Sequence, residues 1–191
     1  GIFPELVLFD CHACHRPMSG KAWGPRQGTG LGPGVVRLND ANLVMFRHVL
    51  AAVDPAAAKQ ALDFSRRLHL ATTVDREQTL AVARALRAQL LAWRDTTTST
   101  EFPADSLGVI LGSLVADAER GEFRDYAAAE QAAMAVQSVV VAFEGAGLLD
   151  EAAAKRMQER VDALYATIEN DERWSMAKFT EALRAARAAA P

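Results

Sequence analysis

The fold is decided by the stretch DPAAAKQALDFSRRLHLATTVDREQTLAVARALRAQLL, residues 54–91, which contains two helix starts. Asp54 followed by Pro55 combines an N-cap residue with a proline at the first helical position. Asp75, with Gln78 three residues later, is typical of a capping pair. After each start the apolar residues recur with the 3.6-residue period of a helix. We therefore predict two consecutive α-helices here.

The same helical pattern extends on both sides of this stretch. Asn39 or Asp40 can cap a preceding helix, and Gly145 and Gly147 can end a later one. No segment alternates apolar and polar residues as a half-buried strand does. We therefore predict an all-α fold, with a loop-rich segment over residues 1–40 and an antiparallel helical bundle over residues 41–191. The helices expected after residue 91 lie at about 107–115, 126–143, 150–168 and from about 173 onward.

Composition excludes several classes of protein. The chain has 191 residues, 50% of them hydrophobic and 24% charged, with a formal net charge of −3. Without a basic excess to neutralise phosphates, we expect no nucleic-acid partner. No apolar run reaches the roughly 20 residues of a spanning helix, so we expect no membrane span. Two cysteines are too few for a disulfide scaffold.

The chain opens on GIFPELVLFD, which has neither an initiator Met nor the pattern of a signal peptide. We interpret the sequence as a fragment of a longer chain or a processed form, with Gly1 left from a cleaved tag.

The residues with the most distinctive chemistry are concentrated near the start of the chain. The first 34 residues hold seven of the 12 glycines, four of the seven prolines and both cysteines. Residues 18–37 show neither helical nor strand periodicity, and a loop of this length is uncommon unless it is functional or disordered. The glycines of this loop do not match a phosphate-binding pattern, so we exclude nucleotide binding.

One motif in this region indicates a cofactor. Cys11-His12-Ala13-Cys14-His15 is a C-x-x-C-H sequence, the pattern by which haem is attached covalently in c-type cytochromes. Two thiols on one short turn can add to the two vinyl groups of a porphyrin, and the next residue then lies under the iron. We predict that Cys11 and Cys14 bind one haem c and that His15 is its proximal ligand.

Two other interpretations of the cysteine pair stay open. One is a C-x-x-C disulfide or dithiol without haem, although the βαβ context of a thioredoxin is missing. The other is a zinc site, for which a second pair of ligands at defined spacing is missing.

The stretch FDCHACHRPMS, followed by GTGLGPGVVRLNDAN, resembles the C-terminal part of bacterial multihaem c-type cytochromes related to hydroxylamine-oxidoreductase-like and nitrite-reductase-like electron carriers. The resemblance covers about the first 50 residues. It implies several haems within electron-transfer distance, often with a second histidine as the distal ligand. This chain contains a single C-x-x-C-H motif, so either the other motifs lie upstream or the module carries one haem.

For the second metal ligand the sequence offers His48, with Met45 on the same helical face as the alternative. A ligand from a missing segment and a five-coordinate iron stay open as well. His69, near a predicted helix C-terminus, is better explained by the helix dipole than by ligation. Candidate partners for the haem propionates are Arg16, Lys21, Arg26 and Arg37.

Together these features predict an electron-transfer module rather than a catalyst on its own. Covalent haem implies a periplasmic location and a redox partner protein or an upstream multihaem segment, and a homo-oligomer stays open. The alternatives are an accessory part of a multihaem oxidoreductase and a haem-free helical interaction domain.

Overall fold

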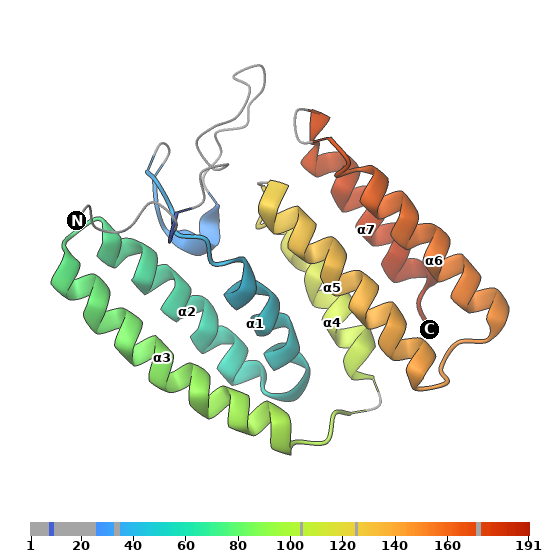
Figure 1. The fold of residues 1–191 in the computed structure, drawn as a ribbon, viewed down its shortest axis with the longest axis horizontal. Helices are drawn as coiled ribbons and strands as arrows, with labels where there is room; N and C mark the ends of the chain where they lie inside the picture. The colour runs from blue at the N-terminus through green and yellow to red at the C-terminus, as the bar shows by residue number, and fades with distance from the viewer. Residues whose placement is uncertain (1–7, 10–25, 33–34, 104, 125, 171–172) are drawn as a thin grey trace. The chain divides into compact units, whose positions relative to one another are not determined.

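A computed structural model describes residues 8–9, 26–32, 35–103, 105–124, 126–170 and 173–191. Over these residues the fold is all-α, as the sequence predicts, and it contains no strand (Figure 1). A short 3₁₀ helix, η3 (Gln27–Thr29), precedes the α-helices. The α-helices are α1 (Ala41–Val53), α2 (Pro55–Thr72), α3 (Arg76–Ser99), α4 (Ser106–Arg120), α5 (Tyr126–Gly145), α6 (Glu151–Ala166) and α7 (Met176–Ala189).

The helices group into two compact units, Gly1–Phe102 and Pro103–Pro191. This division differs from the single bundle expected over residues 41–191. In the first unit α1, α2 and α3 contact one another, and in the second α4 to α7 do so. The boundary follows the end of α3 at Ser99, where the chain leaves helical geometry before α4 begins.

Local capping explains where α2 and α3 begin. The Asp54 carboxylate accepts hydrogen bonds from the backbone N–H groups of Ala56 and Ala57, each at 3.0 Å. The Asp75 carboxylate accepts one from the N–H of Gln78 at 2.7 Å. Both predicted starts are confirmed, since each side chain satisfies N–H groups that have no partner within the helix.

Asp54→Ala is expected to destabilise the protein by about 1 kcal/mol, because it removes both hydrogen bonds at the start of α2. The expected loss in the thermal midpoint of the first unit is about 4–8 °C. Asp54→Ser is the matched control, since serine caps helices as well as aspartate does. Equal midpoints for the alanine and serine variants would show that this cap contributes nothing.

The core of the first unit lies between its three α-helices. Leu50 of α1, Ala61 of α2 and Leu86 and Trp93 of α3 are buried together. Phe64 packs edge-on against Trp93, with ring centroids 6.2 Å apart. The buried residues of α2 are small alanines. They leave room for the larger side chains of α1 and α3 that pack against them.

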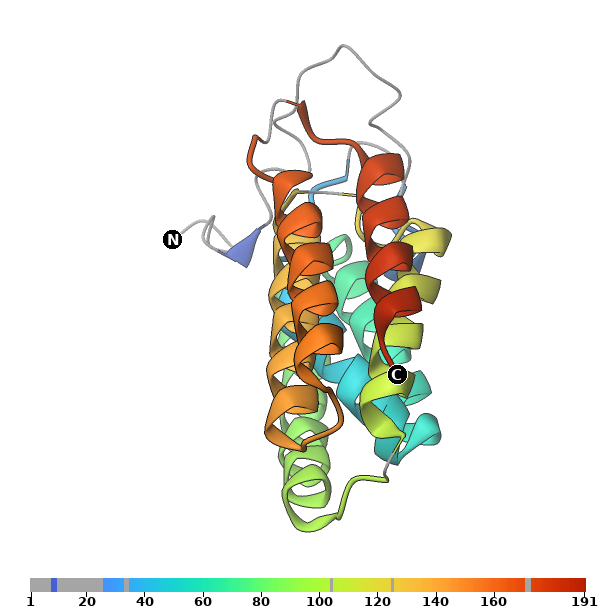
Figure 2. The same cartoon turned by 90° about the vertical axis from the view of Figure 1, so that its right-hand side faces the viewer.

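The second unit is a four-helix bundle in which each helix contacts the next and α7 returns to α4 (Figure 2). One face of α5 is buried, and it consists of Ala128, Ala129, Ala132, Ala133, Val136, Val139, Val140 and Phe143. Gly121 ends α4 with a φ of +77°, a left-handed conformation that glycine adopts without strain. The last helix begins at Met176, capped by Ser175, rather than at about Arg173 as the sequence indicated.

Among the described helices, none is both long and apolar enough to cross a membrane.

Candidate functional site

The predicted haem-attachment residues Cys11, Cys14 and His15 lie outside the described residues. The structure does describe residues on both sides of the segment that contains them. Leu8 and Phe9 precede this segment, residues 10–25, and Arg26 follows it. These flanking residues show where the two ends of the motif-bearing segment are attached.

Both ends are attached to the same short strip of chain, Leu38 to Asp40. On the N-terminal side the carbonyl of Leu8 accepts a hydrogen bond from the N–H of Asn39 at 2.9 Å. Phe9 forms an isolated antiparallel bridge with Leu38. On the other side the Arg26 guanidinium forms an ion pair with the Asp40 carboxylate. The two ends of residues 10–25 are thus held close together at the N-terminus of α1.

The ion pair is the centre of a buried polar cluster of Arg26, Asp40, Ser65 and His69. The side chains of Arg26 and Asp40 are only 3% and 7% exposed. Asp40 Oδ2 also accepts a hydrogen bond from the Ser65 hydroxyl at 2.7 Å. A buried carboxylate is costly unless its charge is paired and its oxygens are hydrogen-bonded. Here both conditions are met, by Arg26 just before η3 and by Ser65 of α2.

His69 completes the cluster on α2. Its Nδ1–H donates to the Ser65 carbonyl at 2.8 Å, and its Nε2 lies 3.3 Å from the Leu38 carbonyl. The imidazole therefore links α2 to the strip that anchors the motif-bearing segment. His69 lies in the last turn of α2, as the sequence predicts, and the linking contacts are an additional feature that the sequence did not indicate.

Electrostatics around Asp40 favour its ionised form. Burial by itself raises the pKa of the Asp40 carboxyl. The charge and hydrogen bond of Arg26, the charge of His69 and the hydroxyl of Ser65 outweigh this effect and hold the pKa below its usual range. The carboxylate is therefore charged at neutral pH and holds the Arg26 end of the segment.

The residues after Arg26 are fixed against α2 as well. The Thr29 hydroxyl donates to the Arg26 carbonyl at 2.9 Å. Gly30 has a φ of +70°, and a Cβ built there would lie 2.9 Å from Nε of Arg66. Glycine adopts this backbone conformation without strain, whereas a larger residue would be strained and would displace the flexible Arg66 side chain.

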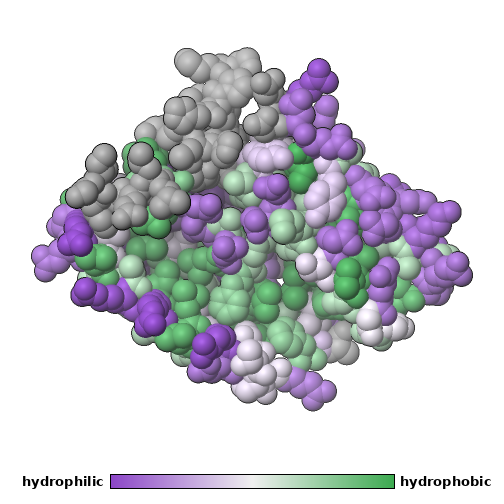
Figure 3. All heavy atoms as spheres, viewed as in Figure 1, coloured by the Kyte–Doolittle hydropathy of each residue, from purple (hydrophilic) through white to green (hydrophobic). Residues whose placement is uncertain are grey.

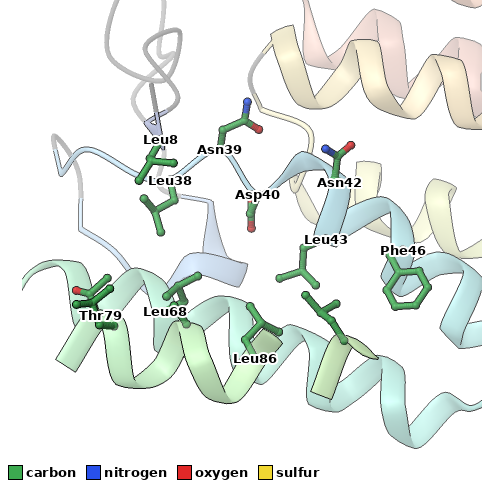
Figure 4. Close-up of a pocket in the computed structure, with 13 residues that line it drawn as sticks. Leu8, Leu38, Asn39, Asp40, Asn42, Leu43, Phe46, Leu68, Thr79 and Leu86 are labelled. Carbon is green, nitrogen blue, oxygen red and sulfur yellow. The ribbon is translucent and has the colours of Figure 1, made fainter. Parts of the chain in front are cut away.

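A cavity of about 520 Å³ opens beside this anchoring strip, within the first unit (Figure 4). The strip forms one end of the cavity, and α1, α2 and α3 form its walls. The volume lies within the range of roughly 300–1,000 Å³ that is typical of ligand and cofactor pockets. The lining residues are Leu8, Leu38, Asn39, Asp40, Asn42, Leu43, Phe46, Leu68, Thr79, Leu80, Ala83, Leu86 and Leu90.

The walls of the cavity are mainly apolar. Leu43, Phe46, Leu68 and Leu90 are only partly buried, although they pack against the core of the unit. Leu8 at the cavity is 50% exposed. In the space-filling view, apolar side chains are gathered over the part of the face formed by α1–α3 (Figure 3). The first unit therefore has an apolar surface that its own described residues leave partly uncovered.

The sequence-predicted ligand His48 is buried, with 2% exposure, but it is not among the residues that line the cavity. The cavity-lining residues of α1 are Asn42, Leu43 and Phe46. At 3.6 residues per turn, His48 lies about 200° around the helix axis from Phe46. His48 and the cavity are thus on different sides of α1. Met45 does not line the cavity either.

The described residues contain no cluster of three or more His, Cys, Asp or Glu side chains that could hold a metal ion. Of the four cations predicted as propionate partners, Arg16 and Lys21 lie outside the described residues. Arg26 is paired with Asp40, and Arg37 is buried.

Sequence reasoning missed both the cavity and the polar cluster. A signal for the cluster was present, since Ser65 and His69 fall on one stripe of α2, one turn apart.

Comparison with known proteins adds no relative: no family model, curated protein or solved structure matches this chain.

Proposed function

We propose that the chain is a c-type cytochrome module that binds one haem covalently through Cys11 and Cys14 and uses it for electron transfer. The C-x-x-C-H motif supplies the two thiols and the imidazole that this attachment needs. The observation that carries the proposal is that both ends of the motif-bearing segment are fixed at Leu38–Asp40, beside an apolar cavity of cofactor size. Anchoring of this kind keeps a tethered cofactor next to the helical unit.

Attachment needs no oxidant or reductant. Each cysteine S–H adds across one vinyl C=C bond of the haem, so that a C–S bond and a C–H bond form and nothing is released. Cys11 and Cys14 must be reduced thiols when this happens, and a disulfide between them blocks it. The mass of the product is therefore the mass of the chain plus one haem.

His15 is the proposed proximal ligand, and the bound haem supplies a reversible one-electron change at its iron. The protein holds the haem, excludes water from it and places it near a redox partner. His48 stays a proposed second ligand for a haem on its own side of α1. If the haem lies on the cavity side of α1, His48 is not its second ligand, because His48 lies on a different side of the helix.

The wider setting follows from the same proposal. Thioether attachment places the protein in the periplasm, where it exchanges electrons with a redox partner protein or with an upstream multihaem segment. The resemblance to multihaem c-type cytochromes supports the second arrangement. A homo-oligomer is compatible with either.

The test is to produce the protein with haem-maturation machinery and to compare it with the variant Cys11→Ala/Cys14→Ala. The wild-type chain is expected to gain the mass of one haem and to show a Soret band that survives denaturation, because the bond is covalent. The double variant is expected to show neither. If the wild-type chain has its unmodified or disulfide-bonded mass under these conditions, the cytochrome proposal is refuted and the interpretation as a haem-free helical domain remains.

A further inference from the structure

We propose that the cavity between α1, α2 and α3 is the seat of the haem ring, with Leu43 and Phe46 of α1, Leu68 of α2 and Leu86 of α3 in contact with it. This inference rests on the proposed function, because it names where the attached group lies. It goes further by assigning a binding role to helical residues that the C-x-x-C-H motif does not include.

The first argument is the length of the tether. Leu8 lines the cavity, and Cys11 is three residues later in the chain. Three residues of extended chain span at most about 10 Å. A ring bonded to Cys11 therefore remains within reach of the cavity wall whatever the conformation between the two residues.

The second argument is the way the opposite end is held. Arg26 follows the motif-bearing segment and is paired with Asp40, which also lines the cavity. Both ends of the segment thus meet at the cavity rather than at separate places on the unit. The two attachment points of the segment therefore lie beside the same cavity.

The third argument is chemical fit. Among the lining residues, the large side chains are leucines and one phenylalanine, which suit a flat apolar ring. Burial of the half-exposed Leu8 and of the partly buried Leu43 and Phe46 under a ring removes apolar surface from water, which is favourable. The single carboxylate, Asp40, is already compensated by Arg26 and Ser65. An apolar occupant therefore meets no unpaired charge from the lining residues.

The close-up in Figure 4 shows this distribution of chemistry. Leu43, Phe46, Leu68 and Leu86 come from three different helices around the cavity, and Asn39, Asp40 and Asn42 lie together along its edge. The apolar wall suits the flat ring of a porphyrin, whereas the lining residues contain no Lys or Arg, so the cations for its two propionates must come from outside the lining.

The experiment compares methyl NMR spectra of the reduced haem-loaded protein and the haem-free Cys11→Ala/Cys14→Ala variant. The ring current of a porphyrin shifts the signals of methyl groups that touch it. We expect large shifts for Leu43, Leu68 and Leu86 and none for Leu111, Leu114 and Leu183, which are fully buried in the second unit. The leucines of the second unit thus serve as controls within the same molecule.

A pair of alanine substitutions on α3 provides a second measurement. Ala83 lines the cavity, whereas Ala85, two residues later, is exposed and does not. We expect Ala83→Phe to fill the cavity and abolish the shifts at the cavity leucines, while Ala85→Phe leaves them unchanged. Haem attachment is also expected to raise the thermal midpoint of the wild type and of Ala85→Phe by about 5 °C or more, and that of Ala83→Phe by much less.

The outcomes separate this inference from the proposed function. A chain that gains one haem but shows no haem-dependent shift at Leu43, Leu68 and Leu86 has its ring elsewhere, which overturns the cavity as its seat and leaves covalent attachment intact. Equal behaviour of the two α3 variants does the same. A chain that gains no haem mass refutes the proposed function itself, and the cavity inference falls with it.

Discussion

Asp40→Asn is expected to lower the free energy of unfolding of the first unit by about 3 kcal/mol or more, because it leaves the buried Arg26 charge without its partner. The side chains of both residues are almost fully buried, so water cannot replace the lost carboxylate. The variant also weakens the bond from Ser65. Urea unfolding followed by hydrogen exchange in peptides from α1 to α3 measures the loss where it occurs.

Asp63→Asn is the matched control for this variant. Asp63 also belongs to the first unit, and it pairs with Arg67 at 3.7 Å, but both side chains are more than half exposed. Exposed pairs contribute roughly 0–1 kcal/mol, so the control is expected to change little. A loss at Asp40 no greater than at Asp63 would mean that the buried pair does not fasten the strip to the unit.

The same pair predicts a dependence on pH. The pKa of Asp40 is lower in the folded protein than in the unfolded chain, so its contribution to stability is fully present above the unfolded value. That contribution falls as the pH drops below about 4 towards the folded pKa. Wild-type protein should therefore lose more stability than Asp40→Asn over this acidic range.

The second large effect is expected in the bundle of α4–α7. Phe179 is fully buried, and its ring packs edge-on against Phe123 and Trp174, at centroid distances of 6.3 and 5.2 Å. Phe179→Ala leaves a cavity that these rings cannot fill by a small movement, so we expect a loss of about 3–5 kcal/mol. Urea unfolding followed by hydrogen exchange in peptides from α4 to α7 provides the measurement.

Leu148→Ala serves as the control in this unit, since Leu148 is 49% exposed. It is expected to change the free energy of unfolding by about 0.5 kcal/mol or less. Similar losses for the two variants would contradict the assignment of Phe179 to a tightly packed core.

Helix starts are the part of the fold that the sequence predicts best. Asp54, Asp75 and Asp150 each accept hydrogen bonds from N–H groups two or three residues later. Such contacts are local, so a few neighbouring residues specify them. The end of α3 is less predictable, because Thr96 and Thr98, which have low helix propensity, continue the helix and bond back to its carbonyls.

Long-range contacts explain what the sequence did not reveal. Asn39 or Asp40 was expected to cap α1. Asn39 Oδ1 accepts a hydrogen bond from the N–H of Ala41 at 3.3 Å, whereas the Asp40 carboxylate makes no capping bond. It bonds instead to Arg26 and Ser65, which are 14 and 25 residues away in the chain. The cavity is formed by the anchoring strip and three helices together. Neither feature can be inferred from periodicity, because each depends on how separate elements pack.

The structure also suggests a proposal for the helices of the first unit. The C-x-x-C-H motif alone predicts an attached haem but says nothing about where the ring lies. The structure adds an anchored segment and a nearby apolar cavity in the first unit. A haem seated there would link the motif to α1, α2 and α3.

The most direct test of a covalent haem is the mass of one tryptic peptide. The first Lys or Arg residues are Arg16, which precedes Pro17 and resists trypsin, and Lys21, so both cysteines fall in the peptide Gly1–Lys21. In protein produced with haem-maturation machinery, this peptide is expected to carry the mass of one haem and to absorb in the Soret region. An unmodified or disulfide-bonded Gly1–Lys21 peptide would contradict the assignment of the chain as a c-type cytochrome module.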